Sequence, residues 1–282
     1  MVSAKYKISV FSRRLSAASV LLSVLCLCVL NGCEVISEGE RLIPVPQPAI
    51  TDGRNHVLIE FTGFRCVNCP KAAEAADELS RTYGDRLITV AMHPATNPFT
   101  RGAEQYDYTC TAADTYYLHL GGLATTPFPA GNIDLQTETD GSMIDYPLWA
   151  TWVAEQMEQT GMVQLTADAA LQAETRQLTV SAHCYAMQPM SLQLATWLVE
   201  DSVAGAQALP DGSVDTHYYH RHMLRGTIGD EWGESVIAQL LPDEYVVTGK
   251  LPEGCDPKHC YAVVVAMDDN KTIINALQLR IE

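Results

Sequence analysis

The sequence predicts an α/β domain followed by an all-β domain that forms an antiparallel β-sandwich. Two observations carry this prediction. Between residues 51 and 162, short apolar runs alternate with segments of helical periodicity, which is the pattern of an α/β unit. From residue 163 to residue 282, strand patterns follow one another without helices between them, which is typical of a sandwich. We therefore expect a domain boundary near residue 163.

The elements of the first domain follow from local patterns. Apolar runs at residues 57–61 and 87–92 predict two buried strands. The apolar stripe at 70–83 predicts a helix, with Gly84 at its C-cap. We then expect a helical insertion at 101–120, a constrained loop at 125–131, a short strand at 132–135 and a helix at 148–160. The buried face of that last helix is expected to carry four residues: Leu148, Trp152, Val153 and Met157.

The second domain is predicted from strands alone. Apolar and polar residues alternate at 178–184, and Leu192, Leu194 and Leu198 are expected on one face of the next strand. Two further strands are predicted at 261–267 and 273–281.

The N-terminus has the three parts of a lipoprotein signal peptide, predicted to be residues 1–32. Four basic residues come first, and an apolar stretch at 17–30 follows, too short for a standard membrane span. The stretch ends in Leu30-Asn31-Gly32-Cys33, the pattern that lipoprotein signal peptidase reads. Cys33 is expected to become the first mature residue and to carry the lipid, palmitate included. A simple signal peptide with a chance cysteine and a retained membrane anchor are the alternatives.

Residues 33–50 read as a tether for a lipid-anchored domain. Pro44, Pro46 and Pro48 alternate with other residues, which favours an extended, semi-stiff backbone. An edge strand that contains prolines is the alternative. No later apolar run is long enough to span a bilayer, so the rest of the chain is expected in an aqueous compartment of the cell envelope.

The charge of the chain limits its partners. The formal net charge is −16, and removal of the signal peptide with its four basic residues makes it −20. So acidic a chain argues against nucleic acid and against anionic lipid as partners. The expected partners are the membrane, through the lipid, and envelope proteins or peptides.

Six cysteines remain after Cys33 and the two in the signal peptide. Short spacing favours the pairs Cys66–Cys69 and Cys255–Cys260, the second as a structural disulfide that closes a hairpin. Cys110 and Cys184 are open: they are either free and buried, or a bridge between the two domains.

Cys66-Val67-Asn68-Cys69 lies between a predicted strand and a predicted helix. The exposed N–H groups and the positive dipole end of a helix N-terminus lower the pKa of a cysteine there. Cys66 is then the expected exposed nucleophile, and Cys69, one turn on, the resolving thiol. A structural disulfide without turnover is the main alternative. Zinc is a weaker one, because no second CxxC pair is present.

This segment resembles the thioredoxin family, in which a cis-proline packs against the disulfide. The resemblance rests on the strand at 57–61, on Cys66 and Cys69, and on a proline loop. Pro129, after Phe128, matches the cis-proline best, and Pro127 is the runner-up. The chain departs from that family before Cys66, where Phe64-Arg65 stands in place of the usual tryptophan.

A polar and aromatic cluster lies in the β-rich part, with Tyr218, His220, His222 and Arg225 as its possible binding residues. His220 and His222 could hold a metal from one strand face. Paired core histidines or a polar network at a strand edge are the favoured alternatives, because no carboxylate has a typical ligand spacing. We expect neither a metal nor a cofactor.

The same region is similar to the 28-kDa outer-membrane protein (Omp) family of lipoproteins. The similarity rests on residues 198–203 with Gln207, on residues 218–225, and on Trp232-Gly233-Glu234. It implies outer-membrane anchoring, a thioredoxin-like domain and an Ig-like sandwich, and it implies no established catalytic activity.

Two functions follow as hypotheses. In the first, the chain is a thiol–disulfide oxidoreductase of envelope proteins, in which Cys66 attacks, Cys69 resolves and Pro129 positions the substrate. In the second, it is a surface-binding or adhesin-like lipoprotein whose CxxC disulfide is structural. Both place it at the outer membrane, either on the periplasmic side or exposed at the surface.

Overall fold

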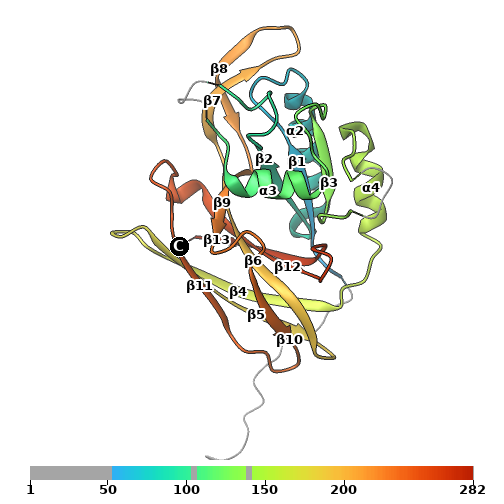
Figure 1. The fold of residues 1–282 in the computed structure, drawn as a ribbon, viewed down its shortest axis with the longest axis vertical. Coiled ribbons are helices and arrows are strands. Elements are labelled where there is room, and N and C mark those ends of the chain that lie inside the picture. Colours follow the sequence, from blue (N-terminus) through green and yellow to red (C-terminus); the bar gives the residue numbers. More distant parts are fainter. Residues whose placement is uncertain (1–52, 103–106, 138–141, 282) are drawn as a thin grey trace, which may run out of the picture. The chain divides into compact units, whose positions relative to one another are not determined.

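The computed structural model describes residues 53–102, 107–137 and 142–281 (Figure 1). The signal peptide, Cys33 and the tether lie outside these residues. Residues 47–282 form one compact unit by their contacts. The all-strand part begins at Val163, the first residue of β4 (Val163–Gln172). A domain boundary near residue 163 stays a prediction, because the two parts share a sheet and a core, as described below.

The first part is built on a small three-stranded unit. β1 (His56–Phe61) pairs in parallel with β2 (Leu87–Met92), and β3 (Ala130–Ile133) pairs antiparallel to β1. Both β1 and β2 are buried along their whole length, as their apolar runs predicted. The strand predicted at 132–135 is displaced, because Asp134 and Leu135 have positive φ angles and turn the chain after Ile133.

The helix predicted at 70–83 is α2 (Cys69–Tyr83), followed by the short 3₁₀ helix η1 (Gly84–Arg86). Gly84 is its C-cap at φ +57°, a conformation that costs glycine little. The last helix is shorter than predicted: η3 (Tyr146–Leu148) precedes α4 (Trp149–Gln156). Trp149 and Val153 are buried, whereas Leu148 is exposed. The predicted burial of Leu148 is therefore wrong, and the next residue, Trp149, is buried in its place.

The predicted helical insertion at 101–120 contains helix only in α3 (Thr111–His119) among the described residues. Asp107 explains part of the difference. Its carboxylate accepts hydrogen bonds from the backbone N–H and the hydroxyl of Thr109, at 3.0 and 2.6 Å. Such local bonds compete with helical ones, and Cys110 enters α3 in an extended conformation.

The second part consists of strands, as predicted. β4 and β11 (Tyr245–Lys250) flank β5 (Gln177–Ala186) in an antiparallel three-stranded sheet. β7 (Val203–Ala208) and β8 (Val214–His220) form a separate hairpin. The other strands are β6 (Met190–Glu200), β9 (Met223–Ile228), β10 (Glu234–Ala238), β12 (Cys260–Met267) and β13 (Ile273–Arg280).

These last five strands join the first part in one mixed sheet of eight strands. Its order is β13-β12-β6-β9-β2-β1-β3, with β10 also paired to β6. The junction is a parallel bridge between Ala91 of β2 and Met223 of β9. The strands named here pair antiparallel with one another and pack against the three-stranded sheet, as expected of a sandwich, but one of the two sheets continues into the α/β part.

The centre of this sheet has a hydrophobic core on each face. In β12, Val263 and Val265 belong to the core that contains α3, while Ala262 and Val264 belong to the core against the three-stranded sheet. The neighbouring β6 follows the same rule, with the predicted face of Leu192, Leu194 and Leu198 toward the three-stranded sheet. At these central strands the layers are therefore α3, the mixed sheet and the three-stranded sheet, whereas α2 and α4 pack with Leu58 of β1 in a separate core.

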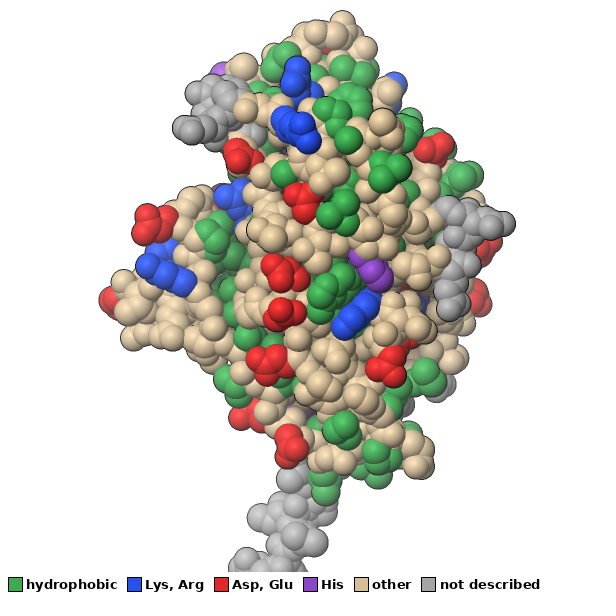
Figure 2. Space-filling view, in the orientation of Figure 1, with side chains coloured by type: hydrophobic (Ala, Val, Ile, Leu, Met, Phe, Trp, Pro, Cys, Tyr) green, Lys and Arg blue, Asp and Glu red, His purple; other side chains and the backbone are tan. Residues whose placement is uncertain are grey.

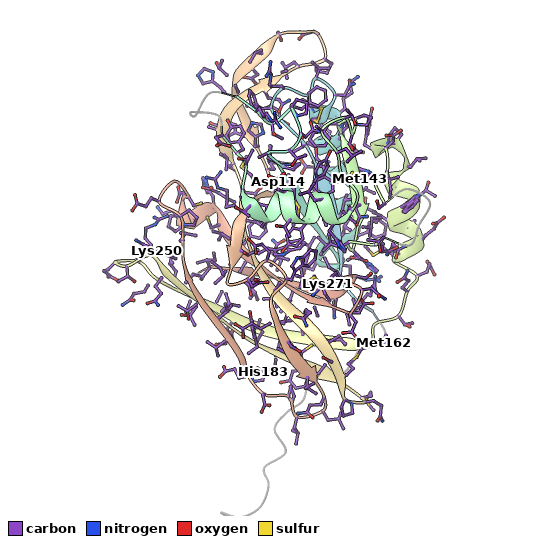
Figure 3. All side chains as sticks on the ribbon, in the orientation of Figure 1. Asp114, Met143, Met162, His183, Lys250 and Lys271 are labelled. Carbon is purple, nitrogen blue, oxygen red and sulfur yellow. A yellow bond between two sulfur atoms is a disulfide. The ribbon has the colours of Figure 1, made fainter. Side chains whose placement is uncertain are left out.

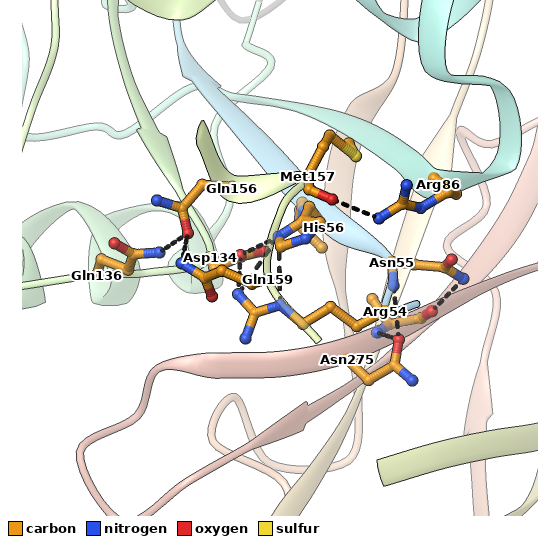
Figure 4. A network of polar contacts seen from close by, with 12 residues as sticks. Arg54, Asn55, His56, Arg86, Asp134, Gln136, Gln156, Met157, Gln159 and Asn275 are labelled. Atoms are coloured by element: carbon orange, nitrogen blue, oxygen red, sulfur yellow. Dashed lines mark hydrogen bonds and ion pairs between the residues drawn. The ribbon is translucent and has the colours of Figure 1, made fainter. Parts of the chain in front are cut away.

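A buried ionic network joins β1, β3 and β13 (Figure 4). The Asp134 carboxylate accepts hydrogen bonds from Arg54 Nη2 at 2.5 Å and from the backbone N–H of Val57 at 2.8 Å, and lies 2.7 Å from His56 Nδ1. Its backbone carbonyl accepts from the N–H of Ile273 at 2.8 Å. Asp134 is fully buried, so its charge is compensated by these neighbours rather than by water.

Asp134→Asn is expected to lower the free energy of unfolding by about 3 kcal/mol, because it leaves the Arg54 charge buried without its partner. Urea denaturation with the disulfide intact measures this loss. Asp85→Asn, at an exposed carboxylate, is the control and is expected to change it by less than about 0.5 kcal/mol. Equal effects of the two substitutions would contradict this role of Asp134.

Candidate functional site

Cys66 and Cys69 form a disulfide in the loop between β1 and α2, with their Cα atoms 5.4 Å apart. Cys69 is the first residue of α2, which begins one residue before its predicted start. The loop is held by backbone bonds from Cys66 N–H to the Gly63 carbonyl at 2.9 Å and from Arg65 N–H to the Phe99 carbonyl at 3.1 Å. A Cβ at Gly63 would lie 2.5 Å from that Phe99 oxygen, so only glycine fits there.

The disulfide is covered by the β7–β8 hairpin of the second part. The Gln207 side chain donates to the Cys66 carbonyl at 2.9 Å, and the Ala208 N–H donates to the Phe64 carbonyl at 2.7 Å. Cys66 is 2% exposed and Cys69 1%. The expectation that Cys66 is exposed is therefore wrong: the hairpin comes from residues about 140 positions further along the chain, and no local pattern announces it.

The Phe128–Pro129 peptide bond is cis, the isomer expected at Pro129. Pro129 is buried, and Phe128 shares a hydrophobic core with both cysteines. The Phe128 ring stacks on Phe99 at a centroid distance of 6.1 Å, which ties the proline loop to the CxxC loop.

A small cavity lies behind Cys69, beneath the hairpin. Its volume is about 20 Å³, and its lining includes Glu60 of β1, His93 at the end of β2, and Tyr218 and His220 of β8. The Glu60 side chain is 3% exposed, and burial raises its pKa to about 8. Sequence reasoning did not single out Glu60, although an acidic residue within an apolar strand pattern is a signal that could have done so.

Two histidines face each other at this cavity. The rings of His93 and His220 are 5.9 Å apart, and His220 Nε2 lies 3.2 Å from the Ala206 carbonyl. Burial lowers the pKa of His220 to about 4 and that of His93 well below its usual range. Both are therefore neutral near pH 7. Neither ring nitrogen of the buried His93 has a hydrogen-bond partner among the described residues.

The predicted cluster of Tyr218, His220, His222 and Arg225 is divided. Tyr218 and His220 line the cavity, whereas His222 turns away at φ +52° and breaks the strand alternation. His222 Nδ1 lies 2.9 Å from the Tyr261 hydroxyl, and its Nε2 is 3.4 Å from the Asp77 carboxylate of α2. His220 and His222 therefore do not form a common metal site.

Arg225 belongs to a different group, at the start of β12. Its Nε is 3.3 Å from Glu200 Oε2, and the ligand atoms of Glu200, Cys255 and Cys260 lie within 4.8 Å of one another. The disulfide expected between Cys255 and Cys260 is not formed in this structure; their thiols are free and hydrogen-bonded, which lowers the pKa of Cys255. The turn η4 (Pro257–His259) separates them. The positive charge of Arg225 disfavours the binding of a metal cation by Glu200, Cys255 and Cys260.

The two unassigned cysteines are also free. Burial raises the pKa of Cys110 to about 11 and that of Cys184 to about 12, so both thiols are protonated at neutral pH. Cys110 packs against the core that contains α3, and Cys184 belongs to the core between the mixed sheet and the three-stranded sheet. The bridge between the two parts is not formed in this structure.

The surface agrees with the negative charge of the chain. Acidic side chains are spread over the strand-rich lower half of the face in Figure 2, with few basic ones between them. Among the described residues, none of the helices is long and apolar enough to cross a membrane.

The fold and the disulfide site define an α/β and β-rich protein with a CxxC pair at a helix N-terminus. Residues 116–282 match the family described as outer membrane protein Omp28, and this match covers more than half of the chain. The protein therefore belongs to the Omp28 family. The CxxC segment lies before the matched region, so the family match does not include the Cys66–Cys69 disulfide.

A solved structure has a similar fold. HBP35 of Porphyromonas gingivalis is similar with a TM-score of 0.61 at 15% identity, over 81% of this chain and 76% of that chain. A protein from Agrobacterium tumefaciens reaches a TM-score of 0.44 at 14% identity, over 80% of this chain and 94% of that chain. No curated protein matches the chain in sequence.

The raised pKa of Glu60 predicts a pH dependence of stability. The pKa is 4.5 for an exposed carboxyl and about 8 in the folded protein, so between these values the folded state holds one more proton than the unfolded chain. This contribution to stability is complete below pH 4.5 and is lost as the pH rises through 8. Glu60→Gln removes it.

Wild type is therefore expected to lose stability relative to Glu60→Gln as the pH rises from about 5 to 8, with a slope of at most about 1.4 kcal/mol per pH unit. Urea denaturation at several pH values measures the difference. Glu74→Gln, at an exposed position of α2, is the control. Parallel curves for wild type and Glu60→Gln would show that Glu60 is not protonated in the fold.

Proposed function

We propose that this chain is a lipid-anchored outer-membrane protein whose CxxC pair exchanges disulfides with envelope proteins or peptides. The observation that carries the proposal is the buried carboxyl of Glu60 beside Cys69. Burial of an ionisable group is costly, and a disulfide that only stabilises the fold does not need one next to it. Perturbed carboxyls near a redox pair are typical of functional sites.

The chemistry follows from the geometry. A substrate thiolate attacks Cys66 Sγ, a new disulfide forms between substrate and Cys66, and the Cys66–Cys69 bond breaks. The electron pair goes to Cys69 Sγ, which takes a proton from the Glu60 carboxyl and becomes a thiol. Glu60 suits this step because it is protonated up to a pH of about 8. The proposed step leaves the substrate in a mixed disulfide, which a second substrate thiolate releases as a substrate disulfide and a reduced CxxC pair.

Three further features support a thioredoxin-like role for the first part. The disulfide follows a buried strand directly, it begins a helix, and the cis bond at Pro129 belongs to the same core. Pro129 is proposed to position the substrate backbone.

The purified protein is expected to catalyse disulfide exchange with reduced glutathione and to reduce insulin when dithiothreitol is supplied. Cys66→Ser should abolish both activities, and Cys110→Ser is the matched control that should retain them. Absence of activity in either redox state of the wild type would refute exchange. A reduction potential below about −300 mV for Cys66–Cys69 would likewise indicate a structural bond.

A second candidate function is ligand binding with a purely structural disulfide. The observation that favours it is the coverage of both cysteines by the hairpin, which leaves almost none of their surface exposed. In that case Cys66→Ser would lower the stability of the fold and leave ligand binding unchanged.

The lipid anchor is the other half of the proposal. Cys33→Ala in the full chain is expected to abolish incorporation of labelled palmitate and to release the protein from the membrane fraction. Cys28→Ala, inside the proposed signal peptide, is the control and should leave labelling intact. Labelling that persists in Cys33→Ala would contradict the anchor. Release of a fragment by protease treatment of intact cells distinguishes surface exposure from periplasmic placement.

A further inference from the structure

A second cavity lies in the strand-rich part and shares no lining residue with the cavity behind the disulfide. Its volume is about 490 Å³. Four strands or their ends line it: β10 with residues 234–237, the start of β11 with residues 243–246, and β5 and β6 with Ala182, Cys184 and Leu194. β6 and β10 belong to the mixed sheet, and β5 and β11 to the three-stranded sheet. The cavity is therefore formed between the two sheets.

The path of the chain after β10 explains where the cavity lies. β10 pairs with β6 of the mixed sheet, and Gln239 then contacts the other sheet. The Gln239 N–H donates to the Cys184 carbonyl, and its carbonyl accepts from the Ala186 N–H, both at 3.3 Å. The chain pairs with β5 again only at Tyr245, opposite Ala182. The cavity lies at this crossing from one sheet to the other.

The floor of the cavity is apolar. Ala182 and Leu194 have no exposed surface, and Cys184 is 3% exposed. All three belong to the hydrophobic core between the mixed sheet and the three-stranded sheet, and Val236 packs against that core. Water molecules on such a floor find few hydrogen-bond partners, whereas an apolar group that covers it removes apolar surface from water. The floor therefore favours a ligand with an apolar body.

The rim of the cavity is acidic. Glu234, Asp243 and Glu244 line it and are exposed, and the described residues of its lining include no lysine, arginine or histidine. The negative charge acts on the cavity wall, since burial, and after it the charge of Glu234, raises the pKa of Tyr245 to about 12. Three carboxylates beside one cavity attract a positive charge and repel a negative one. The rim therefore favours a cation.

Two basic residues of the surrounding strands lie outside the cavity. His183 stands between Ala182 and Cys184 on β5, and because side chains alternate along a strand it points to the opposite face of the sheet (Figure 3). There its ring stacks on that of Tyr185, at a centroid distance of 6.2 Å. Lys250 is the last residue of β11, whereas the first two residues of that strand line the cavity (Figure 3). Neither residue supplies a counter-charge within the cavity.

We propose that this cavity binds a small organic cation with an apolar body, that is, an aromatic or aliphatic amine. The body lies on the floor, against Leu194 and Val236, and the ammonium group lies at the rim beside the three carboxylates. The volume of about 490 Å³ is within the range of about 300–1,000 Å³ that is typical of small-molecule sites. The proposal does not depend on disulfide exchange, because the lining includes no residue of the CxxC loop.

The exposure of the carboxylates sets the size of the expected selectivity. Water and salt screen each of them, so each contributes only a small factor to the affinity. Together they are expected to make an amine bind about tenfold more tightly than a neutral molecule of the same shape.

Isothermal titration calorimetry of the purified protein with three indoles tests the proposal. Tryptamine is a cation, tryptophol is neutral and indole propionate is an anion, and the three have similar shapes. Tryptamine is expected to bind at one site about tenfold more tightly than tryptophol, and indole propionate more weakly than either. Added salt should reduce the difference between tryptamine and tryptophol, because it screens the rim. The methyl NMR signals of Leu194 and Val236 should shift on binding, which locates the ligand.

A triple variant tests the rim. Replacement of its three carboxylates by amides should lower the affinity for tryptamine about tenfold, to that for tryptophol. The variant consists of Glu234→Gln, Asp243→Asn and Glu244→Gln. The matched control changes the net charge equally at three exposed carboxylates that do not line the cavity, and it should retain most of the affinity. It consists of Glu155→Gln, Glu253→Gln and Asp269→Asn.

A single variant tests the cavity itself. Ser235→Trp places a large ring in the cavity from an exposed position of β10 and should abolish the binding of tryptamine and tryptophol alike. Thr248→Trp, at an exposed position of β11 that does not line the cavity, is the control and should leave binding unchanged.

Each contrary outcome removes one part of the proposal. Equal affinities of the wild type for tryptamine and tryptophol would refute the selection of a cation. Equal losses in the triple variant and its control would show attraction by net charge alone and refute the rim. Binding that Ser235→Trp leaves unchanged would lie elsewhere and refute the cavity. Absence of tryptamine binding at millimolar concentration would refute the site as a whole, and disulfide exchange would be unaffected by any of these results.

Discussion

The structure depends on a sheet whose central strands are buried on both faces. β12 and β6 carry apolar side chains on either side, because α3 covers one face and the three-stranded sheet covers the other. Burial of both faces removes about twice the apolar area from water that a surface sheet would. A polar side chain on either strand therefore needs a partner, as Trp197 shows by donating from its indole nitrogen to the Tyr116 hydroxyl at 2.8 Å.

This shared sheet explains why the CxxC loop lies beneath strands of the second part. β6 brings β9 beside β2, and the chain that leads into β9 is the β7–β8 hairpin. The hairpin is thereby placed over the disulfide, where Gln207 contacts the Cys66 loop. His222, in the turn after β8, contacts Asp77 of α2 from the same direction. The CxxC disulfide and the strands of the Omp28-matched region are thus neighbours in the fold.

The sequence predicted most elements, and the errors have local causes. β1, β2, α2, β5 and β12 follow from their apolar periodicity, which depends on neighbouring residues alone. The predicted helix begins only at α3, because the carboxylate of Asp107 accepts a hydrogen bond from the backbone N–H of Thr109 just before it. Leu148 was misplaced because η3 precedes α4, so the helical phase begins one residue later than the apolar pattern suggested.

The sequence by itself determined that a CxxC pair lies between a buried strand and a helix and that strands dominate after residue 163. Its resemblance to the thioredoxin family indicated Phe128–Pro129 as the bond to expect in cis. Only the tertiary structure decided that Glu60, His93 and His220 meet behind Cys69, that a hairpin covers Cys66, and that His222 and Arg225 belong to other contacts. The physical reason is the range of the interactions. Periodicity and turn chemistry act within a few residues, whereas the cavity is assembled by pairings such as Ala91 with Met223, which follow from the burial of a whole sheet.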